Sequence, residues 1–237
     1  MTVIWHDLEC GGYGEDLALW RSLAVEHGDP VLDVGAGTGR VTLDLARHGH
    51  RVTALDRDHE LLDELARRAD ALEVSTVAAD ARDFDLGRRF ALIVVPMQTI
   101  QLLGGANGRR AFLRCARGHL DSAAVLAIAI SEALDLFEVV PGTPAPLPDM
   151  RELDGVVYSS HPTAVRADRG GFVLERRRET VTRGGRRSVE QDLVRLDRVS
   201  SAELEREAAT VGLRPAGRAL IPANEDYVGS SVVVLRA

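Results

Sequence analysis

The sequence predicts an α/β protein with a doubly wound, mostly parallel seven-stranded sheet and an added antiparallel β insertion. Three observations predict this fold class. Apolar runs of strand length alternate with amphipathic helical segments through the first half, as in parallel sheets covered by helices on both faces. A glycine-rich turn follows the first apolar run, at 35–39. After residue 150 the pattern changes to β-rich segments joined by glycine turns, which is typical of antiparallel strands.

The first-half elements are expected in strict alternation. A helix near 15–26 ends where Gly28, Asp29 and Pro30 interrupt the helical pattern. Strands are expected at 31–34, 51–56, 74–77, 91–95 and 124–130. Helices are expected between them, at 39–48, 59–69 and 109–119.

The second half begins with a proline-rich stretch, at 141–148, that cannot continue a helix or a central strand and predicts a loop or lid. Beyond it, glycine turns separate three segments that predict an antiparallel meander, at 156–165, 172–182 and 188–197. Ser200 and Glu203 predict a capping box for a helix that runs to about residue 211. The last two strands are expected at 216–221 and 230–235.

Composition narrows the range of partners. The formal net charge of −7 argues against general nucleic-acid binding, which needs a clustered basic surface. Arginines at 176–187 alternate with glutamates, which favours charge pairing between facing strands. No leader-like start and no apolar run of membrane-spanning length are found, so we expect a cytoplasmic protein with no membrane partner. No metal is expected, because no His, Cys and carboxylate set has ligand spacing. The oligomeric state stays open.

One local pattern points to a ligand. Residues 31–39 read Val-Leu-Asp-Val-Gly-Ala-Gly-Thr-Gly, and the next predicted strand ends on Asp56. Glycines at such a turn let a ligand lie on the main chain, and an acid ending the next strand can accept two hydrogen bonds from a ribose diol. Position 40 is Arg, whereas the dinucleotide fingerprint has glycine there. The pattern therefore predicts an adenosine-containing cofactor and disfavours NAD.

The spaced residues Asp33, Gly35, Gly37 and Gly39 resemble the first motif of the class I S-adenosylmethionine-dependent methyltransferases. Two later segments resemble that family in the same order, at 78–82 and 90–98. The resemblance covers residues 15–130 well. It implies a Rossmann-like methyltransferase fold, in which the last strand runs antiparallel, and S-adenosyl-L-methionine as the cofactor.

The resemblance also implies roles for individual residues. The three glycines carry the methionine end of the cofactor, Asp33 helps hold its ammonium group, Asp56 takes the ribose hydroxyls and Asp80 lies near the adenine amino group. N-terminal aromatic residues often close such sites, and among Trp5, His6 and Tyr13 we favour Tyr13. The expected cofactor-binding residues are Tyr13, Asp33, Gly35, Ala36, Gly37, Gly39, Asp56, Arg57, Asp80, Ala81, Pro96 and Met97.

The acceptor site is expected where the parallel strands end. Gln98 and Gln101 follow the fourth strand, and Tyr227 lies with Glu225 and Asp226 in the loop before the last strand, so we expect substrate contacts from Gln98, Gln101 and Tyr227. The catalytic base is not identified. Glu132, directly after the fifth strand, and His161, on the insertion, are weak candidates, and an ordinary solvated or structural role is the alternative for each.

The function that follows is methyl transfer to a small-molecule amine or hydroxyl acceptor. Residues 1–134 and 198–237 are expected to form the cofactor-binding α/β domain, with 135–197 as a lid loop and β insertion over the acceptor site. Such an insertion resembles those of glycine, sarcosine and amino-sugar N-methyltransferases; a dimerisation or edge-covering subdomain is the alternative. The alternatives for the whole chain are a non-catalytic cofactor-binding or regulatory protein of this fold and an NAD-dependent oxidoreductase.

Overall fold

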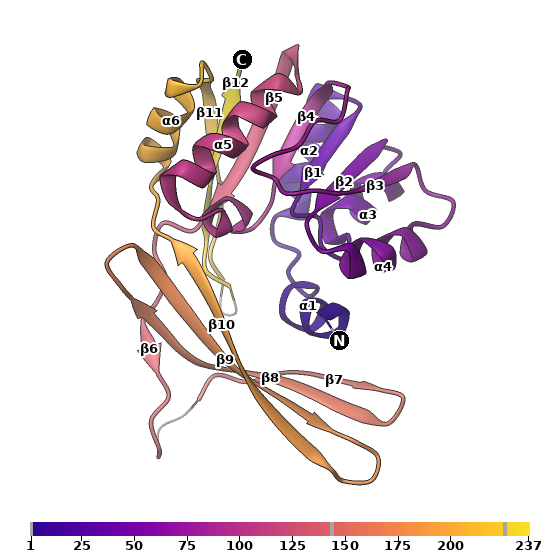
Figure 1. The fold of residues 1–237 in the computed structure, drawn as a ribbon, viewed down its shortest axis with the longest axis vertical. Helices are drawn as coiled ribbons and strands as arrows, with labels where there is room; N and C mark the ends of the chain where they lie inside the picture. Colours follow the sequence, from indigo (N-terminus) through magenta and orange to yellow (C-terminus); the bar gives the residue numbers. More distant parts are fainter. Residues whose placement is uncertain (1, 143–144, 225–226) are drawn as a thin grey trace. The chain divides into compact units, whose positions relative to one another are not determined.

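The computed structural model describes residues 2–142, 145–224 and 227–237 (Figure 1). The chain divides into two compact units. The α/β unit comprises Tyr13–Glu132 and Val199–Ala237, and the insertion unit comprises Ala133–Arg198 with the described part of Met1–Gly12. The first twelve residues thus group with the insertion, whereas the sequence analysis assigned them to the α/β domain. The expected role of the insertion as an acceptor cover stays a prediction.

The α/β unit contains a seven-stranded sheet in the order β11-β12-β5-β4-β1-β2-β3. Neighbouring strands from β5 to β3 run parallel, while β12 is antiparallel to both β5 and β11. This arrangement confirms the predicted mostly parallel sheet. The strands are β1 Val31–Val34, β2 Val52–Asp56, β3 Val74–Ala78, β4 Phe90–Val95, β5 Leu120–Ile130, β11 Arg214–Ile221 and β12 Ser230–Arg236.

The helices of this unit cover two faces of the sheet. Side chains of α5 and α6 join one core cluster, and side chains of α2 and α3 join another, so alternate residues of β1 point to opposite clusters. All four residues of β1 are buried, as expected for a central parallel strand. The helices are α2 Leu17–His27, α3 Arg40–Arg47, α4 His59–Ala69, the 3₁₀ turn η1 Thr99–Leu102, α5 Gly105–Gly118 and α6 Ser201–Thr210.

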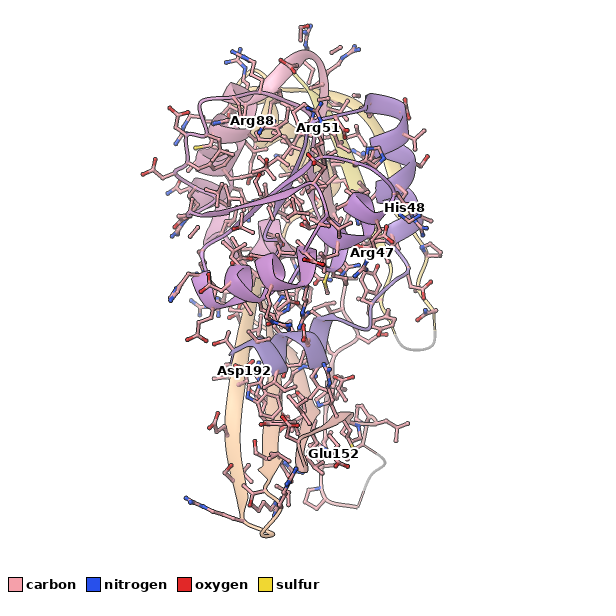
Figure 2. The ribbon with its side chains drawn as sticks, turned by 90° about the vertical axis from the view of Figure 1, so that its right-hand side faces the viewer. Arg47, His48, Arg51, Arg88, Glu152 and Asp192 are labelled. Atoms are coloured by element: carbon pink, nitrogen blue, oxygen red, sulfur yellow. The ribbon has the colours of Figure 1, made fainter. Side chains whose placement is uncertain are left out.

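The ends of several helices carry capping side chains or suitable charges. Ser200 and Glu203 form the predicted capping box at the start of α6. Asp58 caps α4, because its side chain accepts from the main-chain N–H groups of the first turn. Arg47 and His48 lie exposed at the end of α3, where a positive charge suits the carbonyl end of the helix (Figure 2). In the described part of the chain, no helix is long and apolar enough to cross a membrane.

A ligand site is expected at the carboxyl ends of the parallel strands. The strand order reverses next to β1, because the chain runs from β1 outward to β2 and β3 on one side and returns through β4 and β5 on the other. Ligands of open α/β sheets bind at such a switch point, outside the carboxyl ends of the strands. The glycine-rich turn at 35–39 lies directly at this point, after β1.

The insertion unit contains a five-stranded antiparallel sheet in the order β10-β9-β8-β6, with β7 paired to β8. The prediction of three strands is wrong in number, because β6 and β7 form on either side of the proline-rich stretch 141–148. Each of these short strands pairs only with β8. β7 begins directly after Pro148, so no proline interrupts it. The strands are β6 Phe137–Glu138, β7 Asp149–Leu153, β8 Val156–Ala167, β9 Gly171–Val181 and β10 Arg187–Asp197.

A helix that the sequence analysis did not predict, α1 Thr2–Cys10, packs in the same unit. The helix expected near 15–26 is present as α2, and α1 precedes it. Trp5 makes an edge contact with Tyr158, with ring centroids 5.6 Å apart. Glu9 receives two hydrogen bonds of 2.7 Å from Arg178. Nine residues with little periodicity carry a weak helix signal, and these contacts stabilise the helix.

The arginine-rich segment of β9 is neutralised by acids. Arg178 also contacts Asp192 at 2.9 Å, and Asp192 is labelled in Figure 2. Arg187 on β10 donates two hydrogen bonds to Glu179 on β9, at 2.7 and 3.0 Å. The predicted pairing of charges between facing strands is confirmed for this pair.

Candidate functional site

The glycine-rich loop connects β1 to α3. Gly35, Gly37 and Gly39 all have positive φ angles, of 76°, 55° and 94°. The main-chain N–H groups of Gly35 and Ala36 both donate to the carbonyl oxygen of Leu55, at 2.8 and 3.1 Å. The loop is thereby attached to β2, which ends one residue later on Asp56.

Two of these glycines make room for protein side chains. A Cβ on Gly35 would lie 2.5 Å from Cγ2 of Thr99, the first residue of η1. A Cβ on Gly39 would collide with Leu65 of α4. Close packing at 35 and 39 therefore requires glycine whether or not a ligand is bound, a reason that the sequence analysis did not identify.

Asp56 holds the loop from the neighbouring strand. Its Oδ2 accepts the main-chain N–H of Gly37 at 2.8 Å, and its Oδ1 accepts the N–H of Asp58 at 3.0 Å. Each carboxylate oxygen can accept a second hydrogen bond. Asp56 can thus hold a ribose diol while it keeps the loop in place.

Asp33 carries a buried oxygen with no partner. The residue is 1% exposed, and its Oδ2 accepts a hydrogen bond of 2.6 Å from Thr42 on α3. Its Oδ1 is buried without a hydrogen-bond partner. Burial raises the pKa of the Asp33 carboxyl to about 6, while the Thr42 hydrogen bond and the charge of Arg40 oppose that rise. An ammonium group fits this site, since it supplies both the missing donor and the opposite charge.

Arg40, the first residue of α3, contacts the segment that precedes α2. Its guanidinium forms a two-pronged pair with Asp16, which is fully buried. The guanidinium lies 5.0 Å from the ring centre of Tyr13 and donates to the carbonyl oxygen of Tyr13 at 3.0 Å. Neither Asp16 nor this role of Arg40 was identified from the sequence.

Tyr13 and Tyr227 form an aromatic pair in the α/β unit. Their ring centroids are 5.0 Å apart, in an edge-on arrangement. Burial raises the pKa of the Tyr13 phenol to about 12, so this hydroxyl stays protonated at neutral pH. Two other candidates from that loop, Glu225 and Asp226, lie outside the described residues.

The predicted adenine-side residues lie after β3. Arg82 donates to both carboxylate oxygens of Asp80, at 2.9 Å to Oδ1 and 2.6 Å to Oδ2. These hydrogen bonds lower the pKa of Asp80 to about 2, and the charge of the exposed Arg57 acts in the same direction. The oxygens of Asp80 that would meet an adenine amino group therefore also interact with Arg82.

The residues after β4 lie beside the glycine loop. Met97 has a φ of 52°, a backbone conformation that is unusual for a residue with a side chain. The hydroxyl of Thr99 donates to the carbonyl oxygen of Pro96 at 3.0 Å. The predicted pair Pro96 and Met97 thus forms a tight, strained turn that the sequence pattern did not reveal.

The two glutamines after β4 both bond to Ser131 at the end of β5. Gln101 is 1% exposed, and its amide group pairs with the main chain of Ser131 through two bonds, at 2.8 and 3.1 Å. Gln98 is partly buried and donates to the hydroxyl of Ser131 at 3.0 Å. Their expected contacts with substrate stay predictions, and the geometry gives Gln101 a structural role in joining the two strand ends.

The two weak base candidates lie in different units. Glu132, in the α/β unit, accepts hydrogen bonds from the hydroxyl and main-chain N–H of Ser201, which lower its pKa. His161 lies on β8 of the insertion unit, with its Nε2 3.1 Å from the hydroxyl of Ser159. Both side chains have ordinary partners, and their catalytic roles stay predictions. Among the described residues, no group of three His, Cys, Asp or Glu side chains is placed to hold a metal ion.

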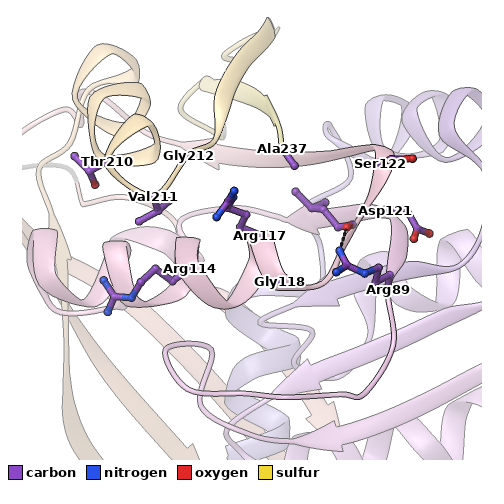
Figure 3. Close-up of a pocket in the computed structure, with 11 residues that line it drawn as sticks. Arg89, Arg114, Arg117, Gly118, Asp121, Ser122, Thr210, Val211, Gly212 and Ala237 are labelled. Carbon is purple, nitrogen blue, oxygen red and sulfur yellow. Dashed lines mark hydrogen bonds between the residues drawn. The ribbon is translucent and has the colours of Figure 1, made fainter.

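A separate hollow lies at the amino ends of the strands (Figure 3). It measures about 1140 Å³, and its lining includes Arg89, Arg114 and Arg117. Arg89 precedes β4 and donates to the carbonyl oxygen of Leu120, the first residue of β5, at 2.6 Å. The glycine loop follows the carboxyl end of β1, so this hollow is not part of the site described above.

Two curated relatives match parts of the chain. A ribosomal RNA small subunit methyltransferase A from Deinococcus radiodurans is 43% identical over 58 residues, 24% of this chain and 20% of that protein. A cypemycin N-terminal methyltransferase from a Streptomyces species is 33% identical over 108 residues, 45% of this chain and 44% of that protein. The matched segments thus span less than half the length of these relatives.

Solved structures match nearly the whole chain. The sugar N-methyltransferase KedS8 from a Streptoalloteichus species has a TM-score of 0.74 at 19% identity, covering 99% of this chain and 92% of that chain. The amino pentose methyltransferase CalS10 from Micromonospora echinaspora has a TM-score of 0.72 at 20% identity, covering 100% and 98%. At these identities the likeness shows the fold. Residues 31–121 match the methyltransferase domain family model, and this segment contains the glycine-rich motif from which the resemblance was predicted.

Proposed function

We propose that the protein is an S-adenosylmethionine-dependent methyltransferase that methylates an amine of a small molecule. The observation that carries the proposal is the buried carboxylate of Asp33, whose Oδ1 has no hydrogen-bond partner, beside the glycine loop. A methionine ammonium fits this atom, and Asp56 lies at the end of the next strand to bind a ribose. One acid is thus placed for the amino-acid end of such a nucleoside, and the other is placed for its ribose.

When bound, the cofactor supplies a methyl group already activated by its sulfonium, so the reaction is an in-line displacement at carbon. The work of the protein is alignment and exclusion of water. In this proposal Asp33 holds the ammonium, Asp56 holds the ribose and Met97 borders the methyl group. The tight turn at Met97 and its packing in the core limit its movement, which favours a fixed position.

An amine acceptor is favoured over a hydroxyl by the residues after β4 and β5. Residues 96–104 contain no ionisable side chain, and the first ionisable residue after β5, Glu132, bonds to Ser201. Tyr13 keeps its proton at neutral pH, since its pKa is about 12. A hydroxyl must lose its proton as it attacks, whereas a neutral amine attacks with its lone pair and releases the proton afterwards. The names of KedS8 and the cypemycin enzyme also refer to nitrogen or N-terminal methylation.

Isothermal titration calorimetry with S-adenosylhomocysteine and with NAD tests the cofactor. We expect micromolar binding of the first and no binding of the second. A panel of small primary and secondary amines, with alcohols of matched shape, then tests the acceptor by transfer of a labelled methyl group. Turnover restricted to amines supports the proposal. Tight cofactor binding without any turnover would instead favour a non-catalytic binding protein, and binding of NAD would favour an oxidoreductase.

A further inference from the structure

Position 40 holds an arginine where the dinucleotide fingerprint has glycine, and the structure gives this arginine a buried set of partners. The Arg40 side chain is 10% exposed and that of Asp16 is 0% exposed. Nη2 of Arg40 donates to Oδ2 of Asp16 at 2.8 Å, and Nη1 donates to Oδ1. A forked pair of this kind fixes the direction of both side chains.

The same arginine reaches the other end of the short segment 13–16. Its Nη1 donates to the carbonyl oxygen of Tyr13 at 3.0 Å, and its guanidinium lies over the Tyr13 ring at 5.0 Å. Trp20 contributes one more hydrogen bond, from its indole nitrogen to Oδ2 of Asp16 at 2.7 Å. Arg40 therefore binds the segment at both of its ends.

The position of Arg40 in the chain connects this segment to the glycine loop. Gly39 is the last residue of the loop, and Arg40 is the first of α3. The Arg40 charge also acts on Asp33, whose pKa it lowers, while Asp16 and Asp56 raise it. A displacement of Arg40 would therefore affect both Tyr13 and Asp33, the acid on β1.

We propose that Arg40 is a positioning residue for the cofactor site: it holds segment 13–16, and with it the Tyr13 ring against Tyr227, beside the methionine end of the cofactor. The inference rests on the proposed function. Arginine is required because its planar group serves the carboxylate of Asp16, the carbonyl of Tyr13 and the aromatic ring together. A lysine ammonium is a point charge and cannot satisfy all three partners.

The test compares Arg40→Lys with Arg21→Lys as a matched control. Arg21 also links α2 to α3, through Asp44 at 3.4 Å, and it donates to the carbonyl oxygen of Leu17 within α2. None of these contacts involves Tyr13. We expect Arg40→Lys to raise the dissociation constant for S-adenosylhomocysteine by about tenfold, the equivalent of one charge-assisted hydrogen bond. Arg21→Lys should stay within about twofold of the unaltered protein.

Two further measurements separate positioning from a loss of folding. In active protein, the KM for the methyl donor should rise in Arg40→Lys with little change in kcat. Arg40→Lys should melt at a lower temperature than Arg21→Lys, because the fully buried Asp16 loses part of its pairing, but it should stay folded at the temperature of the titration. The double variant Asp16→Asn/Arg40→Gln removes both charges, so no buried charge is left unpaired, and it should fold and show the same affinity loss.

The outcomes for the inference and for the proposed function are distinct. Binding of S-adenosylhomocysteine by Arg40→Lys and by the double variant with the affinity of the unaltered protein would overturn the inference alone. Failure of the unaltered protein to bind would overturn both. A loss of affinity in Arg40→Lys, with Arg21→Lys unaffected and both variants folded at the temperature of the titration, supports the inference.

Discussion

Asp33 accepts a hydrogen bond from Thr42 through one carboxylate oxygen and keeps the other oxygen buried without a partner. The pair links the central strand β1 to α3 beside the glycine loop. A buried carboxylate of this kind destabilises the free protein when it is ionised. The same ionised carboxylate stabilises a bound cation. Ionisation of Asp33 should therefore lower the stability of the free protein and raise its affinity for the cofactor.

The first prediction concerns stability. The pKa of Asp33 rises from 3.8 to about 6 on folding, so the folded protein binds more protons than the unfolded chain in this window, and stability falls as pH rises through it. Asp33→Asn should remove this pH-dependent loss of stability, because asparagine does not ionise. The variant should gain up to about 3 kcal/mol of unfolding free energy at pH 7. Urea denaturation at several pH values measures it, and a gain that persists below the unfolded pKa would contradict the assignment.

The second prediction concerns cofactor affinity. A bound ammonium favours ionised Asp33, so below about pH 6 the free protein must release a proton on binding. Affinity for S-adenosylhomocysteine should therefore fall as pH drops from 7 to 5, by up to about tenfold per unit below the pKa. Titration calorimetry in buffers of different ionisation enthalpy should detect the released proton. Asp33→Asn serves as the control and should show a flat profile.

The third prediction concerns Asp56. Asp56→Ala removes the proposed partner of the ribose diol and the observed partner of the Gly37 N–H, and should weaken cofactor binding by about 1.5 to 3 kcal/mol. The control is Asp58→Ser, which keeps a capping side chain at the start of α4. Calorimetric titration of both variants checks the result. Unchanged affinity in Asp56→Ala would exclude Asp56 from the site.

The fourth prediction separates packing from backbone strain at Gly35. Gly35→Ala introduces a Cβ at a φ of 76° and also places it against Thr99. Gly49→Ala introduces only backbone strain, because its φ is 90° and no atom lies near the added Cβ. We expect Gly49→Ala to lose about 1–2 kcal/mol of stability and Gly35→Ala to lose about 1–3 kcal/mol more. Chemical denaturation gives both values. Equal losses would show that Thr99 can move aside.

The fifth prediction contrasts the two glutamines. Gln101→Ala leaves the main-chain N–H and carbonyl of Ser131 without their side-chain partner in a buried position, and should lower stability by about 2–3 kcal/mol. Gln98→Ala removes a single partly exposed hydrogen bond and should cost less than about 1 kcal/mol. If Gln98 contacts the acceptor, its variant should also raise the KM for the acceptor. Thermal melts and steady-state kinetics check both effects.

Much of the α/β unit could be predicted from the sequence. The runs that became β1, β2, β4 and β5 are apolar over strand length, and the helices between them show helical spacing of apolar residues. The capping box at Ser200 is a contact between residues three apart, so its pattern is visible in the chain itself. The helix α1 and the strands β6 and β7 are short, and they form through partners elsewhere in the insertion unit.

One histidine shows how tertiary contacts overrule a local expectation. His119 follows the end of α5, a position where a positive charge would suit the carbonyl end of the helix. In the structure its Nε2 lies 2.9 Å from the main-chain nitrogen of Leu86, and its Nδ1 lies 2.7 Å from the carbonyl oxygen of Cys115. The ring therefore connects the end of α5 to a segment that is 33 positions away in the sequence.

The sequence by itself determined the order of strands and main helices in the α/β unit and the placing of glycines and acids at its strand ends, because these depend on residues close together in the chain. Only the tertiary structure decided how these groups are held. Arg40 meets Asp16 across 24 positions, and Gln101 meets Ser131 across 30. Only folding brings such partners within hydrogen-bond range and removes the water that would otherwise bind them. No local sequence pattern could therefore predict these contacts.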